Sequence, residues 1–381
     1  MDPVLNKTAD KLIPISEPWL GRQEALALTE TIKDNWISQG PKVKEFEAAI
    51  AKVTHKTYGS ACNSGTTALH LALHVCDVGP GDEVIIPDLT MIALANAVLL
   101  TGATPVFVDS NYKSEVGNLG LDNISRAITN KTKAVIVVHT YGEPVQDIKA
   151  IKDHCSRLSI KLIEDCAEAL FGRLDNQCLG SFGHLSVFSF YSNKNITTGE
   201  GGMVTTDSLE VKERLDRVRM HAFTPGKHFC HTERAFGYRM TDMQAAIGLA
   251  QLGRASEFMF RRKEIRQMYD EAINRDQIGL GFFKVPPTTD SSAYWVMPLC
   301  TYLPRTRDKL REHLAYHGID TRTYFQPMHK QVFLKKYANP NDGYLWSRYL
   351  ADRGLYIPLY PKLKDEDINY IIDAIGSYNE N

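Results

Sequence analysis

Short apolar segments alternate with helical segments from residue 58 to residue 166, and this alternation constrains the fold more than any other feature of the chain. Strands that alternate with helices form right-handed crossovers and a mostly parallel sheet. Runs such as VIIP and VIVV are continuously apolar, which is typical of strands covered on both faces. The pattern therefore predicts an α/β fold. The expected strands are residues 58–62, 83–88, 104–109, 134–141 and 161–166, and the expected helices are residues 68–75, 91–100, 121–128 and 145–158.

The segments on either side of this region extend the same architecture. Helices are expected at residues 23–36 and 43–53, a strand at 203–207, and helices at 209–220 and 242–273. The C-terminal part predicts strands at 294–302, 320–325 and 356–360, with helices at 307–317, 343–353 and 365–377. We therefore expect a large domain at residues 1–255, which includes the N-terminal helical segment, and a smaller α+β domain at residues 256–381.

The charges of the chain nearly cancel, with 44 Lys and Arg against 45 Asp and Glu. No overall field recruits nucleic acid or an anionic membrane, so we expect a small-molecule function. The N-terminus has no apolar core of the signal-peptide kind, and runs such as residues 92–100 are too short to span a bilayer. The seven cysteines never occur at C-x-x-C spacing, which favours reduced thiols in a cytoplasmic protein over disulfides or a zinc site.

Residues 186–204, SVFSFYSNKNITTGEGGMV, place one lysine, Lys194, just past an apolar strand. An amine in such a position can be partly desolvated, which lowers its pKa and suits it to catalysis. The ordinary alternative is a solvated loop lysine, because most lysines are surface charges.

Two further groups are expected at the same edge of the sheet. The turn Ser64-Gly65-Thr66 offers hydroxyls, close backbone approach and free helix N–H groups for a phosphate, although an ordinary helix N-cap is the alternative. Asp165 ends an apolar strand, either as a helix cap or as the counter-ion of a cationic heterocycle. It lies 29 residues before Lys194, about one βαβ unit. An amine, a carboxylate and a phosphate-binding turn are the groups that pyridoxal 5′-phosphate (PLP) requires.

Other catalytic patterns are absent from the sequence, which contains neither G-x-S-x-G nor H-E-x-x-H. His221, His228 and His231 are conceivable metal ligands, but no cysteine or carboxylate has matching spacing. We favour an aromatic-rich loop at a subunit boundary and predict no metal site.

The chain resembles the DegT/StrS family of PLP-dependent sugar aminotransferases from about Ile15 to its C-terminus. The segment NITTGEGGMV is especially similar to perosamine-synthase-type enzymes, which aminate C4 of a nucleotide-linked 4-keto-6-deoxyhexose. The resemblance implies a type I aminotransferase fold with a mostly parallel seven-stranded sheet, and a homodimer whose two active sites are each completed by the partner. The motifs that carry it are WISQGPKVKEFE, ACNSGTTALHLAL, GPGDEVIIPDLT, ANAVLLTGATPVFVD, IEDCAEA, FSFYSNKNITTGEGGMV, YRMTDMQAAIGLAQL and DTRTYFQPMH.

The resemblance also implies roles for individual residues. Lys194 would carry PLP as a Schiff base, Asp165 would pair with the pyridine nitrogen, and Glu168 would lie near the cofactor. The phosphate would be bound by Ser64, Gly65, Thr66 and Ser189, and the substrate pocket would contain His329 and Tyr324.

Two positions depart from the family pattern. Met91 stands where relatives often have an aromatic ring over the pyridine, so stacking would use a thioether. Gly237 stands where relatives usually have an asparagine that reaches the partner's phosphate, which leaves that contact between subunits open, with Arg239 as one substitute.

The function expected from this resemblance is transamination of a nucleotide-linked 4-keto-6-deoxyhexose in amino-sugar biosynthesis for glycans such as O-antigen. Glutamate would donate the amino group and leave as 2-oxoglutarate, and the product would be of the perosamine or viosamine type. The alternatives are a 3-aminotransferase, a 3-dehydratase and a non-catalytic PLP-binding regulator. The 3-dehydratases carry histidine where this chain has Lys194. The sequence does not choose among GDP, UDP and dTDP.

Overall fold

A computed structural model of the chain describes residues 5, 11–224, 226–227, 229–274, 282–283, 291–302 and 305–378. Two helices, α1 (Arg22–Lys33) and α2 (Pro41–Val53), precede the first strand. Proline at the first position of α2 fits there because that N–H has no partner within the helix.

The main sheet has seven strands in the order β1-β9-β8-β5-β4-β2-β3. Strand β9 runs antiparallel to both of its neighbours, and the other neighbouring strands are parallel. The predicted α/β fold with a mostly parallel seven-stranded sheet is therefore confirmed. The strands are β1 (Tyr58–Cys62), β2 (Glu83–Pro87), β3 (Thr104–Val108), β4 (Thr132–Val138), β5 (Lys161–Asp165), β8 (Leu185–Ser189) and β9 (Gly202–Thr206).

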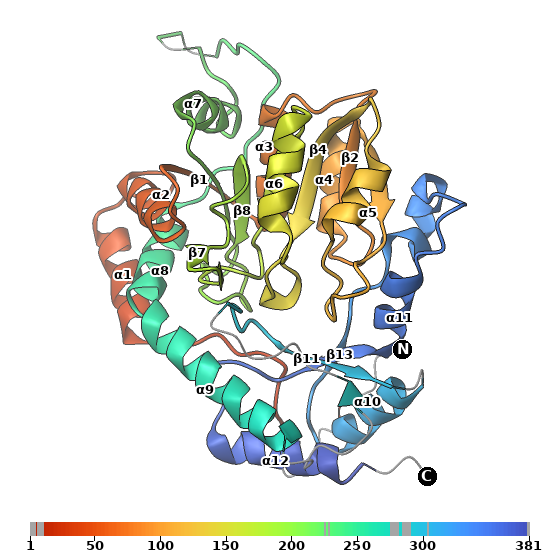
Figure 1. The fold of residues 1–381 in the computed structure, drawn as a ribbon. Coiled ribbons are helices and arrows are strands. Elements are labelled where there is room, and N and C mark those ends of the chain that lie inside the picture. The colour runs from red at the N-terminus through yellow and green to blue at the C-terminus, as the bar shows by residue number, and fades with distance from the viewer. Residues whose placement is uncertain are drawn as a thin grey trace.

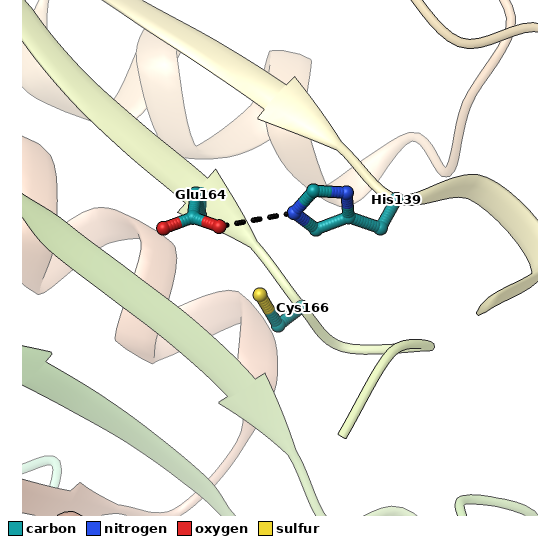
Figure 2. A group of neighbouring side chains, drawn as sticks. All are labelled: His139, Glu164 and Cys166. Atoms are coloured by element: carbon teal, nitrogen blue, oxygen red, sulfur yellow. Dashed lines mark hydrogen bonds and ion pairs between the residues drawn. The ribbon is translucent and has the colours of Figure 1, made fainter. Parts of the chain in front are cut away.

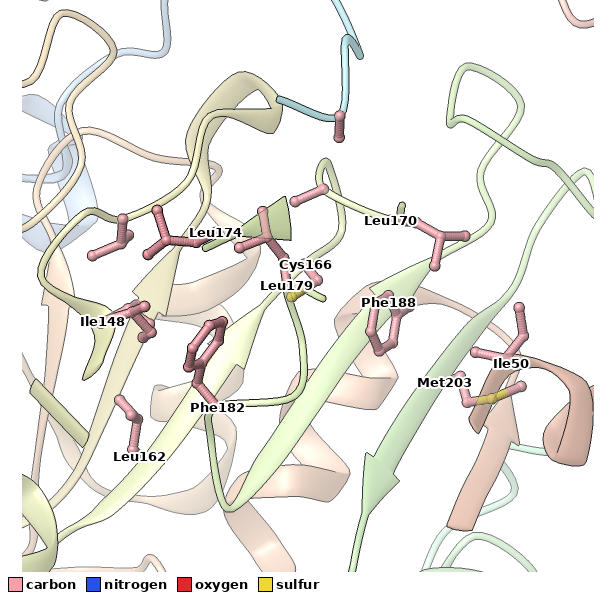
Figure 3. Packing of buried hydrophobic residues seen from close by; sticks show 14 of the residues in the cluster. Ile50, Ile148, Leu162, Cys166, Leu170, Leu174, Leu179, Phe182, Phe188 and Met203 are labelled. Atoms are coloured by element: carbon pink, nitrogen blue, oxygen red, sulfur yellow. The ribbon is translucent and has the colours of Figure 1, made fainter. Parts of the chain in front are cut away.

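Both faces of this sheet are covered, which explains the continuously apolar strands. Along β2, Val84 and Ile86 face one hydrophobic cluster while Ile85 faces the other. One cluster includes α3 (Gly65–Val75), α4 (Ala93–Thr101) and α7 (Leu209–Val218). The other includes α2, α5 (Leu121–Ala127), α6 (Ile148–Arg157) and α8 (Asp242–Gly253), and Figure 3 shows Phe182 and Phe188 packing within it.

The long helix predicted at residues 242–273 is two helices. Helix α8 ends at Gly253, Arg254 leaves the helical conformation with φ −107°, and α9 (Ala255–Asn274) begins beyond it. The helix breaks at Gly253 because glycine is a poor helix former. Figure 1 shows α9 running from the large sheet toward the smaller one.

The smaller sheet has the order β10-β11-β13-β12, and all of its strand pairs are antiparallel. Its core contains Ile265, Leu314 and Ile371 from three helices. The elements are β10 (Phe282–Phe283), β11 (Met297–Thr301), β12 (Arg322–Thr323), β13 (Gly354–Ile357), α10 (Thr306–Tyr316), α11 (Leu345–Arg353) and α12 (Asp365–Gly376). A separate hairpin joins β6 (Arg173–Leu174) to β7 (Gln177–Cys178).

The N-terminal segment contacts the smaller unit and not only the larger one. The Ile13 N–H donates to Gly318 O and the Asp320 N–H donates to Ile13 O, both at 2.9 Å, and the Ile13 side chain is buried in the smaller core. The division into two domains at residue 255 stays a prediction. The segment around Ile13 was assigned to the large domain but packs against the smaller unit.

Several predicted strands are shorter than expected, including β11, which covers Met297–Thr301 of the expected residues 294–302. Strand β4 ends at Val138, because the chain turns through the 3₁₀ segment Thr140–Gly142, in which Tyr141 has φ 56°. Of residues 320–325, Arg322–Thr323 forms strand β12, paired with β13. None of the helices in the described ranges combines the length and the apolar character needed to cross a bilayer.

Candidate active site

A cavity of about 450 Å³ lies where the carboxyl ends of the parallel strands meet the smaller unit. Ligand sites in open α/β sheets lie at this edge, and the volume falls in the range of small-molecule pockets. Its lining includes most of the predicted residues, namely Ser64, Gly65, Thr66, Met91, Asp165, Glu168, Ser189 and Lys194.

Lys194 reaches this cavity from the loop that follows β8. Its side chain is only 13% exposed, and its Nζ lies 3.9 Å from Glu168 Oε1. The Nζ also lies 4.0 Å from the ring centroid of Trp295. Burial lowers the pKa of the Lys194 amine, while Glu168 and Asp165 act in the opposite direction. The amine is therefore closer to its neutral, nucleophilic form than a surface lysine is.

Asp165 is the last residue of β5 and is buried. Its Oδ1 accepts the backbone N–H of Ala167 at 2.9 Å, and its Oδ2 has no donor among the described residues. Burial raises the pKa of this carboxyl, while the Ala167 N–H and Lys194 act in the opposite direction. The bond to Oδ1 thus orients the side chain, and Oδ2 can accept a hydrogen bond from a protonated nitrogen.

Glu168 stands beside Lys194 and is also buried. Its Oε2 accepts the backbone N–H of Tyr141 at 2.7 Å, which leaves Oε1 toward the amine. Burial raises the pKa of Glu168 to about 7, against the opposing effect of Lys194. The unusual backbone of Tyr141 is what turns its N–H to this carboxylate.

The phosphate-binding turn forms because three chain segments approach closely. Cys62 and Ser189 are both paired with Gly202, so the turn after β1 lies beside the end of β8. A Cβ on Gly65 would lie 2.9 Å from Ser189 Cβ, and one on Gly202 would overlap the Ser64 carbonyl. Only glycine fits at these two positions.

The hydrogen bonds of this turn divide its members into two groups. The Ser64 Oγ accepts the Thr67 N–H at 3.2 Å, so it caps α3, which is the alternative that the sequence left open. The N–H groups of Gly65 and Thr66 have no acceptor within the described part of the chain. These two N–H groups, the N-terminus of α3 and the Ser189 hydroxyl can bind a phosphate.

Met91 lines the cavity and is 49% exposed. Stacking of its thioether on the pyridine ring stays a prediction.

The two predicted substrate residues lie outside the cavity lining. His329 Nδ1 lies 2.7 Å from Asp88 Oδ2, its ring stacks on Tyr344, and its Nε2 has no partner in the described ranges. Tyr324 is buried and its ring packs 4.6 Å from the ring of Tyr141. A direct substrate contact by Tyr324 is therefore not favoured by the geometry.

Three aromatic residues of the smaller unit line the cavity but were not predicted: Trp295, Phe325 and Tyr356. Phe325 is the neighbour of Tyr324, and adjacent residues in an extended segment point in opposite directions. The other two lie near β11 and within β13, which the sequence placed correctly as strands without indicating that they face the large sheet.

Gly237 stands where relatives usually have an asparagine that reaches the partner's phosphate, and the space beside it is limited. A Cβ at Gly237 would lie 3.0 Å from His221 Cε1, so the His221 ring occupies the space where a side chain would begin. His231 Nδ1 lies 2.6 Å from the His221 backbone oxygen. His228, the third histidine considered as a metal ligand, lies outside the described residues.

A second cluster, His139, Glu164 and Cys166, has the atoms of a metal site, as Figure 2 shows. However, the Val145 N–H donates to His139 Nδ1 at 3.0 Å, so the proton is on Nε2, which points at Glu164 Oε1 at 3.1 Å. Glu164 also accepts the backbone N–H groups of residues 180, 182 and 183.

These hydrogen bonds and burial determine which groups of the cluster carry a proton. Burial would raise the pKa of Glu164, but the bonds from His139 and the backbone lower it, and burial keeps the pKa of the Cys166 thiol well above its usual range. The carboxylate is already satisfied and the thiol is protonated. The cluster therefore braces the 180–183 turn against β5.

The cavity fits PLP by the chemistry of its donors. Lys194 supplies the amine, the open oxygen of Asp165 faces the same space, and the N–H groups of the α3 turn lack acceptors among the described residues. Each of these unsatisfied groups matches one part of the cofactor, namely the aldehyde, the ring nitrogen and the phosphate.

Comparison with known proteins agrees with this geometry. Residues 18–376 match the model of the DegT/DnrJ/EryC1/StrS aminotransferase family. The GDP-perosamine synthase of Escherichia coli O157:H7 is 37% identical over 371 residues, which cover 97% of this chain and 99% of that protein.

Solved structures give the same result. The aminotransferase TlmJ from Streptoalloteichus hindustanus matches with a TM-score of 0.89 at 29% identity, over 96% of this chain and 98% of that one. Spr1654 from Streptococcus pneumoniae in its PLP form matches with a TM-score of 0.88 at 28% identity, over 96% of this chain and 98% of that one. Spr1654 has also been solved in PMP and apo forms. This chain therefore belongs to the DegT/DnrJ/EryC1/StrS family of PLP-dependent sugar aminotransferases.

Proposed function

We propose that this enzyme transfers the amino group of glutamate to C4 of a nucleotide-linked 4-keto-6-deoxyhexose and forms a 4-amino-4,6-dideoxyhexose of the perosamine or viosamine type. The observation that carries the proposal is the convergence of Lys194, Asp165 and the α3 turn on one cavity. Similarity to a GDP-perosamine synthase supports the sugar substrate.

Lys194 is the proposed catalytic amine. When bound, PLP supplies an aldehyde that takes up the amino group and a ring that delocalises the electron pair left by Cα–H cleavage. Lys194 Nζ would remove the proton from Cα of glutamate and deliver it to C4′ of the cofactor, acting as base and then as acid. In the second half of the reaction it would move a proton in the opposite direction, from C4′ to C4 of the sugar. Its lowered pKa favours the neutral amine that the first of these steps needs.

Asp165 and the α3 turn hold the cofactor in this proposal. The Asp165 carboxylate would accept a hydrogen bond from the protonated ring nitrogen. The positive charge of that ring would in turn stabilise the buried carboxylate. The Gly65 and Thr66 N–H groups and the Ser189 hydroxyl would bind the phosphate, while Ser64 shapes the turn as a helix cap.

Glutamate and the ketosugar would use the same cavity in turn, which is the basis of ping-pong kinetics. The open side, beside Met91, would admit the sugar, and Phe325 and Tyr356 form the wall of the smaller unit. His329 stays a proposed substrate residue, with Asp88 holding its Nδ1 and leaving Nε2 for a ligand. The nucleotide remains GDP, UDP or dTDP.

Two alternative functions can be distinguished from an aminotransferase, one by the residue at position 194 and the other by an absorbance spectrum. A 3-dehydratase would carry histidine at the position of Lys194. A non-catalytic regulator would bind PLP without reacting with glutamate, whereas an aminotransferase would shift the absorbance of the bound cofactor when glutamate is added.

The test is to incubate the PLP-loaded protein with glutamate and a panel of GDP-, UDP- and dTDP-linked 4-ketosugars and to analyse the products. We expect a 4-amino sugar from at least one of them, and a loss of at least about 10³-fold in turnover in Lys194→Ala, since removal of a catalytic proton-transfer group has effects of this order. Substantial turnover by Lys194→Ala would refute the assignment, and a product aminated at C3 would replace the proposed regiochemistry.

A further inference from the structure

Trp295 contacts two consecutive residues of the catalytic loop. Its Nε1–H donates to the Asn193 backbone oxygen at 2.8 Å. The face of the same indole lies 4.0 Å from Lys194 Nζ, measured to the ring centroid. Trp295 precedes β11 in the smaller unit, whereas Asn193 and Lys194 follow β8 in the larger one. One side chain thus connects the position of the amine to the docking of the two units.

The indole is itself fixed from several sides. Its ring is nearly parallel to that of Tyr141 with centroids 6.3 Å apart, and it also contacts Tyr356. Behind it, Arg262 Nη1 donates to the backbone oxygens of Tyr294, Trp295 and Leu359 at 3.2, 3.0 and 3.0 Å. Trp295 is 5% exposed, so it has little space to reorient.

Two effects oppose each other at the Lys194 amine. Burial disfavours the ammonium form, and a tryptophan face favours it, because the negative face of the ring attracts a cation. The other charged residues that line the cavity are Glu168, Asp165 and Glu200. Glu17 and Arg262 line a small gap that Lys194 also borders. The ring lets a buried amine accept a proton without leaving its place.

We propose that Trp295 is a positioning residue for Lys194: its N–H fixes the backbone before the lysine, and its ring face holds the ammonium group whenever the amine is not bonded to the cofactor. The role rests on the proposed catalytic function of Lys194. It supplies what that function requires, namely a defined resting place for an amine that must leave and return in every cycle.

The test measures the pKa of the Lys194 amine in the full-length chain freed of PLP, from the pH dependence of its labelling by acetic anhydride, read by mass spectrometry. An apo form of the relative Spr1654 has been crystallised, so a chain of this fold persists without cofactor. Trp295→Leu removes the ring face and the N–H, whereas Trp295→Phe removes the N–H and keeps a smaller ring face. We expect the Lys194 pKa to fall by about one unit in Trp295→Leu and by less in Trp295→Phe.

Trp346 offers a matched control. Its Nε1–H also donates to a backbone oxygen, that of Ser114 at 2.7 Å, and its ring stacks on Tyr349 outside the cavity. Trp346→Leu should leave the Lys194 pKa unchanged. An unchanged or raised Lys194 pKa in Trp295→Leu would overturn the proposal.

If Trp295→Leu does not fold, a second measurement tests the contact between the ring and the amine. Biosynthetic incorporation of fluorinated tryptophans weakens the negative ring face while preserving its shape and its N–H. The Lys194 pKa should fall with each added fluorine, and this trend should be much weaker in Trp295→Phe; a flat series in the native sequence would refute the ring contact. Because labelling does not require turnover, loss of the proposed sugar reaction and loss of this contact are separate results.

Discussion

At the scale of single residues, the site brings one amine and two carboxyl groups together at buried positions along one cavity. Burial lowers the pKa of Lys194 and raises the pKa values of Asp165 and Glu168, and in each case the neighbouring opposite charge works against it. These shifts bring the pKa of the amine and the pKa values of the two carboxyl groups closer together, which suits acid–base chemistry.

Glu168 gives a prediction about stability. Its pKa is raised from 4.5 to about 7, so the folded chain holds this proton more tightly than the unfolded chain does. The stabilisation is complete below pH about 4.5 and is lost as the pH rises through about 7. Relative to Glu168→Gln, which resembles the protonated acid at every pH, the native protein should lose roughly 3 kcal/mol over this window.

The measurement is the free energy of unfolding in urea for both PLP-free proteins from pH 4 to pH 8. Curves that stay parallel across that range would show that Glu168 does not titrate as the geometry requires.

The limits of sequence reasoning are also visible at this scale. Lys194 and Asp165 were selected because Lys194 follows an apolar strand and Asp165 ends one. The βαβ unit expected between them is wrong, because residues 166–184, all of which the structure describes, connect β5 to β8 through the β6–β7 hairpin and no helix. Trp295 could not be selected in this way, because its importance comes from an approach to Asn193 across 102 residues of chain. Phe325, which lines the cavity, was not predicted, because sequence gives the motif but not which of two adjacent rings faces a cavity.

At the scale of elements, the end of β9 sets the shape of the phosphate-binding turn. Gly202 is paired with Ser189 on one side and Cys62 on the other, and it lies against the Ser64 carbonyl. Gly202 is thus required by close packing between chain segments and not by flexibility.

Gly202→Ala should consequently damage both the fold and the cofactor site. The added methyl group would overlap the Ser64 carbonyl, and crowding of this kind typically destabilises a core by about 1–3 kcal/mol. We also expect weaker PLP binding, since the turn must shift. Gly79→Ala is the control, because a Cβ there meets nothing within 4 Å. Urea unfolding and PLP titration of both variants decide the matter, and equal PLP affinity in the two would contradict this account of the turn.

Element positions were predicted well where a local pattern carried them. Strand β1 matches its predicted range, and the other large strands differ by a few residues at their ends. The errors have local causes. Tyr141 turns away from β4 in a left-handed backbone conformation, and Gly253 interrupts a pattern that is otherwise continuous. Apolar periodicity does not register either event.

At the scale of the whole molecule, the two units share the site. The Phe325 N–H donates to the Tyr141 hydroxyl oxygen at 2.9 Å, and the Trp295 N–H donates to Asn193 O, so both hydrogen bonds join the smaller unit to the larger. The amine, its indole contact and the cavity wall therefore depend on how the units dock.

Apolar residues at the surface favour the homodimer expected from the family resemblance. Met91 and Tyr191 line the cavity and are about half exposed, at 49% and 47%. Phe223 and Phe229 are exposed on the segment between α7 and α8, which projects from the top of Figure 1. Apolar surface at a cavity mouth and on a projecting loop is typical of an interaction site.

We therefore predict that the protein sediments as a dimer at micromolar concentration, and that Tyr191→Ser weakens association because it removes apolar contact area at the cavity mouth. Sedimentation velocity with and without PLP measures both. Leu345→Ser is a control, since Leu345 is 74% exposed and does not line the cavity. A monomer at all concentrations, with full aminotransferase activity, would exclude a shared site.

We propose that Lys194 is the residue that binds PLP covalently, opposite Asp165. The most direct test is to reduce the PLP-loaded protein with borohydride, digest it and locate the pyridoxyl group by mass spectrometry. The account predicts that the label lies on Lys194 and is lost in Lys194→Ala, while Lys194→Ala still binds PLP reversibly through Asp165 and the α3 turn. A label on another lysine of the native protein, or none, would contradict it.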